Sequence, residues 1–69
     1  MKISARNQLK GVVVDIQTGA INSLVVLKVG DAEIKASITN DAVEDLGLKT
    51  GDEAYAIIKA SNVMVGVDH

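Results

Sequence analysis

The chain has 69 residues with no Cys, Pro, Trp or Phe, which leaves room for one small domain, residues 1–69, and excludes most enzymes. Hydrophobic residues make up 48% of the chain and aromatic residues 1%, so the core must consist of Val, Ile, Leu and Ala, a set that favours strands. The 7 Lys and Arg residues against 9 Asp and Glu residues give a net charge of −2, whereas proteins that bind nucleic acid are usually basic.

Residues 3–10 are predicted to form the first strand, because apolar and polar residues alternate along them. In this pattern Ser4 and Arg6 lie on the same face. Gly11 permits a bend or bulge, after which residues 12–16 continue the strand towards a turn.

Residues 21–29 are predicted to form the second strand, in which the uninterrupted apolar run 24–27 makes both faces apolar. One face of a strand in a small monomer normally meets water, so this run indicates packing between subunits. Residues 30–31 suit a tight hairpin turn. Residues 34–39 then alternate as a half-buried third strand whose polar side ends at Thr39.

Residues 40–46 change to a helical period and predict a helix of about two turns. A Thr or Asn at its start can cap the helix, and acidic residues lie near its positive end. Val43 and Leu46 are expected to face inward, and Gly47 is the expected stop.

The last part of the chain predicts two more strands. A turn at residues 50–52 leads to the fourth strand, residues 53–59, and residues 63–67 can form a fifth. The predicted fold is therefore mainly β, a small five-stranded β-barrel with one short helix. A chain near this length buries only about 60% of its unfolded surface when it folds alone, and this chain has no disulfide, so we expect a homo-oligomer.

No segment predicts contact with a membrane. The longest apolar run, residues 54–58, is far shorter than the roughly 20 residues that a membrane-spanning helix needs. The N-terminus has no apolar stretch of signal-peptide length. We therefore expect a cytoplasmic protein with no membrane partner.

The residues that usually carry catalysis are nearly all missing. There is no Cys nucleophile, and the single His, His69, is the last residue and is expected to be solvated. Asp41, Glu44 and Asp45 could hold a hard cation, but acidic residues at such positions ordinarily stabilise a helix N-terminus. The glycines form no nucleotide-binding loop, and only Tyr55 could stack on a base. We therefore expect no enzyme, no cofactor, no metal held directly by side chains and no nucleic-acid partner.

Hydrogen-bond donors are concentrated in the predicted first strand and at the end of the predicted fourth strand. In a closed barrel these two segments can meet. The donors are the side chains of Ser4, Arg6, Lys59 and Ser61 and the backbone N–H groups of Ala5 and Ala60. This set, with no carboxylate nearby in the sequence, suits a small oxyanion. Spacing alone leaves open the alternative that Arg6 and Lys59 are ordinary surface cations.

Residues 4–11, S-A-R-N-Q-L-K-G, resemble the opening of the molbindin (Mop) family, small cytoplasmic molybdate-binding proteins of the TOBE-like barrel type. The resemblance continues through residues 36–39, 43–48, 57–61 and 63–64, so it covers nearly the whole chain. The same module resembles part of the molybdate-sensing transcription regulators and an appended domain of some transporter ATPases. The opening octet is the specific part, since the later turn signals also occur in unrelated small barrels.

The resemblance implies a barrel like an oligonucleotide-binding (OB) fold, strand exchange within a dimer, and a trimer of such dimers, which is a hexamer. It also implies that molybdate or tungstate binds between subunits and that the protein stores or buffers this oxyanion. A second kind of site near a threefold axis is expected as well, but no motif assigns its residues. Carried over residue by residue, one subunit would provide Ser4, Ala5, Arg6, Lys59, Ala60 and Ser61, and the partner subunit would provide Thr39.

Two alternatives remain open from the sequence. The first is a DNA-binding module of the swapped-hairpin type, whose members share a Leu-Gly, then Gly-Asp pattern like residues 46–47 and 51–52, although the acidic balance argues against it. The second is a purely structural oligomerisation domain in which Arg6 and Lys59 only decorate the surface. Anion binding would refute the second alternative, and retention on a DNA column at low salt would favour the first.

Overall fold

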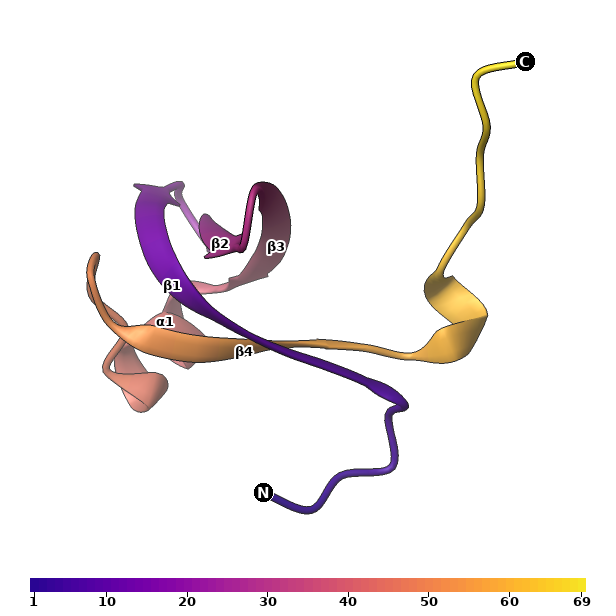
Figure 1. Cartoon of the computed structure of the whole chain (residues 1–69). Coiled ribbons are helices and arrows are strands. Elements are labelled where there is room, and N and C mark those ends of the chain that lie inside the picture. The colour runs from indigo at the N-terminus through magenta and orange to yellow at the C-terminus, as the bar shows by residue number, and fades with distance from the viewer.

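The computed structural model describes residues 1–69 and contains four strands, one α-helix and one short 3-10 helix (Figure 1). The strands are β1 (Asn7–Thr18), β2 (Asn22–Val29), β3 (Ala32–Thr39) and β4 (Glu53–Ile58), and the helices are α1 (Asn40–Leu46) and η1 (Ala60–Asn62). The strands form one antiparallel sheet in the order β3-β2-β1-β4, which curls into a half-barrel (Figure 1). The fold is mainly β, as predicted. No helix of the chain has the length and apolar character needed to cross a membrane.

β1 organises the sheet because its two halves pair with different strands. Residues 7–12 pair with β4 and residues 12–18 pair with β2. The register shifts between Val13 and Asp15, which is a bulge that increases the twist of the strand. The strand runs without interruption through Gly11, where a Cβ atom would lie 2.5 Å from the carbonyl oxygen of Lys28. Gly11 therefore allows close approach of β2, and the bulge lies after it.

The core is small. Only 7 of the 69 residues are buried, which leaves much of the apolar surface of the chain unburied. Val13, Val25 and Leu27 form the central cluster. Val26, on the opposite face of β2 from Val25 and Leu27, is buried too. The single chain therefore buries both faces of β2 at this point, whereas the sequence indicated that another subunit would bury one of them.

Helix α1 forms where the sequence predicts it. The Thr39 hydroxyl oxygen accepts a hydrogen bond from the N–H of the third helical residue at 3.1 Å, and Gly47 ends the helix with a left-handed φ of 63°. Val43 packs against the core as expected. The inward position expected for Leu46 is wrong, since its side chain is 68% exposed. The helix ends at that residue, and Leu48, beyond the left-handed turn, packs against the core instead.

The two ends of the chain differ from the predicted strands. β1 begins at Asn7, so residues 3–6 are not strand, because β4 ends at Ile58 opposite Asn7 and offers nothing further to pair with. Residues 1–6 form an irregular segment, here called the N-terminal arm. The fifth predicted strand, residues 63–67, does not form in the single chain. These residues belong to the C-terminal tail (residues 63–69), which extends away from the body and from every strand that could pair with it (Figure 1).

Candidate functional site

The donors predicted from the sequence lie where the ladder between β1 and β4 opens. Asn7 and Ile58 are the last pair of this ladder, and the side-chain amide of Asn7 also donates a hydrogen bond to the carbonyl oxygen of Ile58 at 3.1 Å. Beyond this pair the chain leaves the sheet on both sides. If the register continued, it would set three pairs opposite each other: Arg6 and Lys59, Ala5 and Ala60, and Ser4 and Ser61.

A cleft of about 550 Å³ occupies the space between the N-terminal arm and η1. All six donor residues predicted from this chain line it, although Ser4 and Arg6 do so from an irregular arm and not from a strand. The complete lining is Ile3, Ser4, Ala5, Arg6, Ile57, Lys59, Ala60, Ser61 and Asn62. We call this space the donor cleft.

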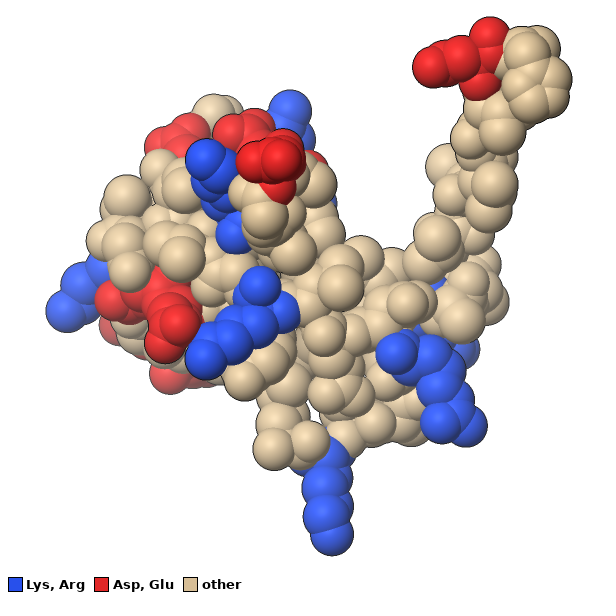
Figure 2. All heavy atoms as spheres, in the orientation of Figure 1, with Lys and Arg blue, Asp and Glu red and all other residues tan.

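Arg6 and Lys59 are the charged residues of the donor cleft, and no Asp or Glu lines it. Neither takes part in an ion pair, since the one salt bridge of the structure joins Lys10 and Glu53 at 3.5 Å. Figure 2 shows the acidic side chains of this view over the half-barrel and at the end of the C-terminal tail, while blue and tan spheres cover the region where the arm approaches η1. Charges farther away than about 8 Å are largely screened at physiological salt, so the local charge is positive despite the net charge of −2.

Backbone donors add to these charges. In η1 the N–H of Asn62 donates to the carbonyl oxygen of Lys59 at 2.9 Å, and the N–H of Val63 donates to that of Ala60 at 3.2 Å. These bonds use neither the N–H of Ala60 nor that of Ser61. The N–H of Ala5 lies in the N-terminal arm, whose backbone N–H groups donate to no backbone carbonyl group. The residues that line the cleft therefore include backbone N–H groups that donate to no group of the chain.

Thr39 does not line the donor cleft of its own chain. It ends β3, which forms the opposite edge of the sheet from β4, and it caps α1. Its hydroxyl oxygen accepts from the helix N–H, which leaves the hydroxyl hydrogen able to donate to another group.

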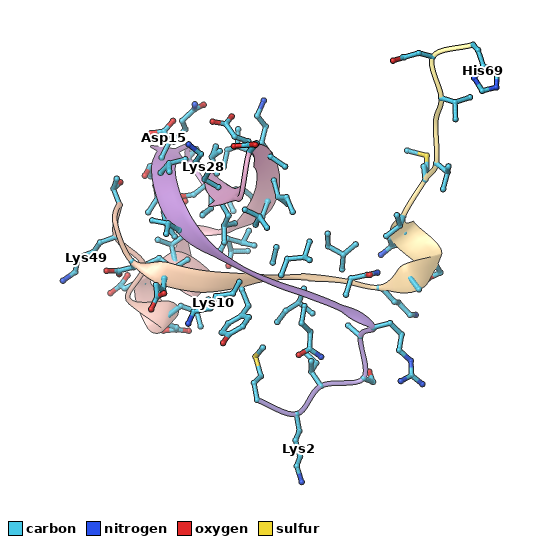
Figure 3. The ribbon with its side chains drawn as sticks, viewed as in Figure 1. Lys2, Lys10, Asp15, Lys28, Lys49 and His69 are labelled. Atoms are coloured by element: carbon cyan, nitrogen blue, oxygen red, sulfur yellow. The ribbon has the colours of Figure 1, made fainter.

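Sequence reasoning missed Asn62, whose side chain lines the cleft directly after the predicted donors. Its position next to Ser61 was the available signal. The structure contains no group of three or more His, Cys, Asp or Glu side chains placed to hold a metal ion. His69 lies at the far end of the C-terminal tail, remote from the arm (Figure 3).

The chain matches known proteins over nearly its whole length. Residues 3–65 match the TOBE domain family. The chain is 54% identical over 69 residues to a probable molybdenum-pterin-binding protein of Haemophilus influenzae, covering 99% of this chain and 100% of that protein.

Two solved structures share the fold. A molybdate-binding protein from Sporomusa ovata has a TM-score of 0.91 and 39% identity, covering 97% of this chain and 100% of the other. The cytoplasmic molybdate-binding protein ModG, solved with molybdate bound, has a TM-score of 0.91 and 49% identity, covering 99% of this chain and 49% of that chain. These similarities confirm the resemblance that the opening octet carries, and the chain belongs to the TOBE domain family.

Proposed function

We propose that this protein binds molybdate, and the near-identical tungstate, in the donor cleft, and that it stores or buffers the oxyanion in the cytoplasm without catalysis. The observation that carries the proposal is the composition of the cleft, which collects Arg6, Lys59 and the neighbouring hydroxyl and N–H donors around a space with no carboxylate. Relatives named for binding molybdenum compounds support the same ligand.

The donors fit the chemistry of a tetrahedral dianion. Such an anion has four acceptor oxygens and loses strong hydration when it enters a protein site. The guanidinium of Arg6 and the ammonium of Lys59 match its two negative charges, and charge-assisted hydrogen bonds are the strong ones. The hydroxyls of Ser4 and Ser61 and the N–H of Ala60 add neutral donors without adding charge.

The same donors predict selectivity against phosphate. Near neutral pH phosphate often carries a proton, and a buried O–H group needs an acceptor. A cleft with no carboxylate offers a poor partner for that proton, so phosphate would lose affinity. Sulfate is fully ionised, and only its smaller size distinguishes it.

Strand exchange between two copies would cover the open side of the half-barrel and would also give the exposed C-terminal tail a sheet to pair with. The open side of the half-barrel, between β3 and β4, is an apolar groove of about 680 Å³ to which 13 hydrophobic residues contribute. The C-terminal tail carries Val63, Val65 and Val67, which share one face of an extended segment and are 50%, 93% and 69% exposed. We infer that residues 63–67 of one copy pair with the free edges of β3 and β4 in a second copy and act as the fifth strand of its barrel.

Three such dimers would make the hexamer that the family resemblance implies. In it Thr39 of the partner subunit would complete the donor cleft through its free hydroxyl hydrogen. Because such a site exists only in the oligomer, the bound anion would stabilise the assembly by mass action.

Calorimetric titration of the purified protein at neutral pH with molybdate, tungstate, sulfate and phosphate tests the proposal. Tight binding of the first two and weak or absent binding of the others is the expected result. Equal binding of all four would show a nonspecific cationic surface, and binding of none would show that the donors have another role. A DNA column at low salt would then test the swapped-hairpin alternative.

A further inference from the structure

Gln8 makes the only hydrogen bonds between the N-terminal arm and the sheet. Its side-chain amide donates to the carbonyl oxygen of Ala5 at 3.1 Å and reaches that of Ile3 at 3.5 Å. No other hydrogen bond of the structure joins residues 1–6 to the rest of the chain. The arm nevertheless provides Ser4, Ala5 and Arg6 to the donor cleft.

The two carbonyl groups that Gln8 contacts orient two peptide units of the arm. Because a peptide unit is planar and trans, each held carbonyl also orients the N–H on the other side of the same unit, which here belongs to Ser4 or Arg6. These N–H groups point away from the Gln8 amide. Gln8 itself does not line the cleft, so it holds the arm from outside and makes no contact with the space where the anion would lie.

We propose that Gln8 is a positioning residue that orders the N-terminal arm before the anion arrives, an inference that rests on the proposed function of the donor cleft. Ordering a chain segment costs conformational entropy, and a segment that is ordered beforehand leaves less of this cost to the binding step. Arg6 has a long side chain on an arm without ladder pairing, so the orientation of its backbone decides how often its guanidinium reaches the cleft.

Gln17 offers a matched control on the same strand. Its side-chain amide is also exposed and donates to the carboxylate of Asp15 at 3.0 Å, a partner that belongs to β1 and not to the cleft. Gln8→Met and Gln17→Met both replace an exposed amide with an uncharged side chain of similar length, so they differ only in the segment that the amide holds.

The test measures molybdate affinity by calorimetry and the unfolding midpoint without anion, for the unchanged chain, Gln8→Met, Gln8→Ala and Gln17→Met. We expect both Gln8 variants to bind molybdate about 3- to 10-fold more weakly, since the exposed hydrogen bonds that hold the arm are lost. Their unfolding midpoints should equal that of the unchanged chain, and Gln17→Met should bind normally. Normal affinity in both Gln8 variants, or a loss of affinity matched by a lower midpoint, would overturn the positioning role.

A double-mutant cycle separates positioning of the arm from a general effect on the cleft. The effect of Gln8→Met should shrink in a Ser4→Ala background, because the arm then has one donor fewer to orient. It should stay complete in a Ser61→Ala background, because Ser61 belongs to η1 and not to the arm. Equal effects in the two backgrounds would contradict the proposal. Arg6→Ala is titrated beside these variants. If the unchanged chain fails to bind molybdate, or if Arg6→Ala binds molybdate as tightly as the unchanged chain, the proposed function is wrong. The proposed role of Gln8 is then wrong as well.

Discussion

Asn7 and Ile58 are joined twice, by their pairing at the end of the β1–β4 ladder and by the hydrogen bond from the Asn7 side-chain amide to the Ile58 carbonyl oxygen at 3.1 Å. This junction fixes the point where the two segments part. Arg6 and Lys59 are the next residues on either side, so both cations lie at the mouth of the same cleft. The last rung of the sheet thus sets the distance between the two segments that carry the donors.

Arg6→Ala is expected to remove most of the affinity for molybdate. A hydrogen bond to a charged group contributes about 1.5–3 kcal/mol, so the dissociation constant should rise roughly 10- to 150-fold. Arg6 is exposed and belongs to no strand, so the unfolding midpoint without anion should stay the same. Lys49→Ala, which removes a cation on the far side of the half-barrel from the C-terminal tail, is the control (Figure 3). Calorimetry in which both variants bind alike would rule out Arg6 as an anion ligand.

Substitutions of Thr39 separate its two roles. Thr39→Ala should lower the free energy of unfolding by about 1 kcal/mol through loss of the helix cap. It should weaken molybdate binding only about 2- to 12-fold, because one neutral donor is lost. Thr39→Asp keeps a capping oxygen but cannot donate to a dianion, so it should retain stability and bind more weakly than Thr39→Ala. A loss for Thr39→Ala as large as that for Arg6→Ala would contradict this ranking.

Gly11→Ala is expected to destabilise the sheet. The added methyl group would lie 2.5 Å from the carbonyl oxygen of Lys28 and 2.8 Å from Cγ2 of Val29, so β1 and β2 would have to move apart. Overpacking of this kind costs about 1–3 kcal/mol. Gln17→Ala is the control, since it adds no atom to an exposed position of the same strand β1. Chemical denaturation should show a lower midpoint for Gly11→Ala only, and equal midpoints would mean that the backbone moves at no cost.

If the C-terminal tail is exchanged as proposed, a charge in the tail should break the oligomer. Val65→Asp would place a carboxylate in the apolar groove of the second copy, where it has no partner, so assembly should fail or weaken strongly. Val65→Leu keeps the position apolar and should assemble normally. Sedimentation equilibrium measures the masses. A hexamer that persists in Val65→Asp would show that the tail lies outside the interface.

The sequence predicts best the elements whose signals are local. The ends of α1 follow from Thr39 and Gly47, which act on their own neighbours, and the structure has both caps where the sequence places them. The strand expected over residues 3–6 depends instead on where β4 ends, at Ile58, which is 51 residues after Asn7, and no local pattern reports that. The expected fifth strand, residues 63–67, does not form in the single chain, and in the proposed exchange it would depend on a second copy.

The sequence predicted six residues that line one cleft, but it did not predict how that cleft is built. The types of Arg6 and Lys59, together with the family resemblance, were enough to select donors that share one cleft. The roles of Asn7 and Gln8 could not be predicted, because an amide in an alternating strand gives no sign of which carbonyl group it will reach. The partners of side-chain hydrogen bonds at the end of a strand pair can be identified only when the register of the two strands is known.

A crystal structure of the protein grown with molybdate, with the metal located by its anomalous scattering, would show whether the anion lies in the donor cleft. The account predicts one anomalous peak in each donor cleft, within hydrogen-bonding reach of Arg6 and Lys59 through the anion oxygens, with Thr39 of the partner subunit completing the shell. Clefts without a peak in crystals of protein that binds molybdate in solution would contradict the account, and the anion would then have to be placed elsewhere on the oligomer.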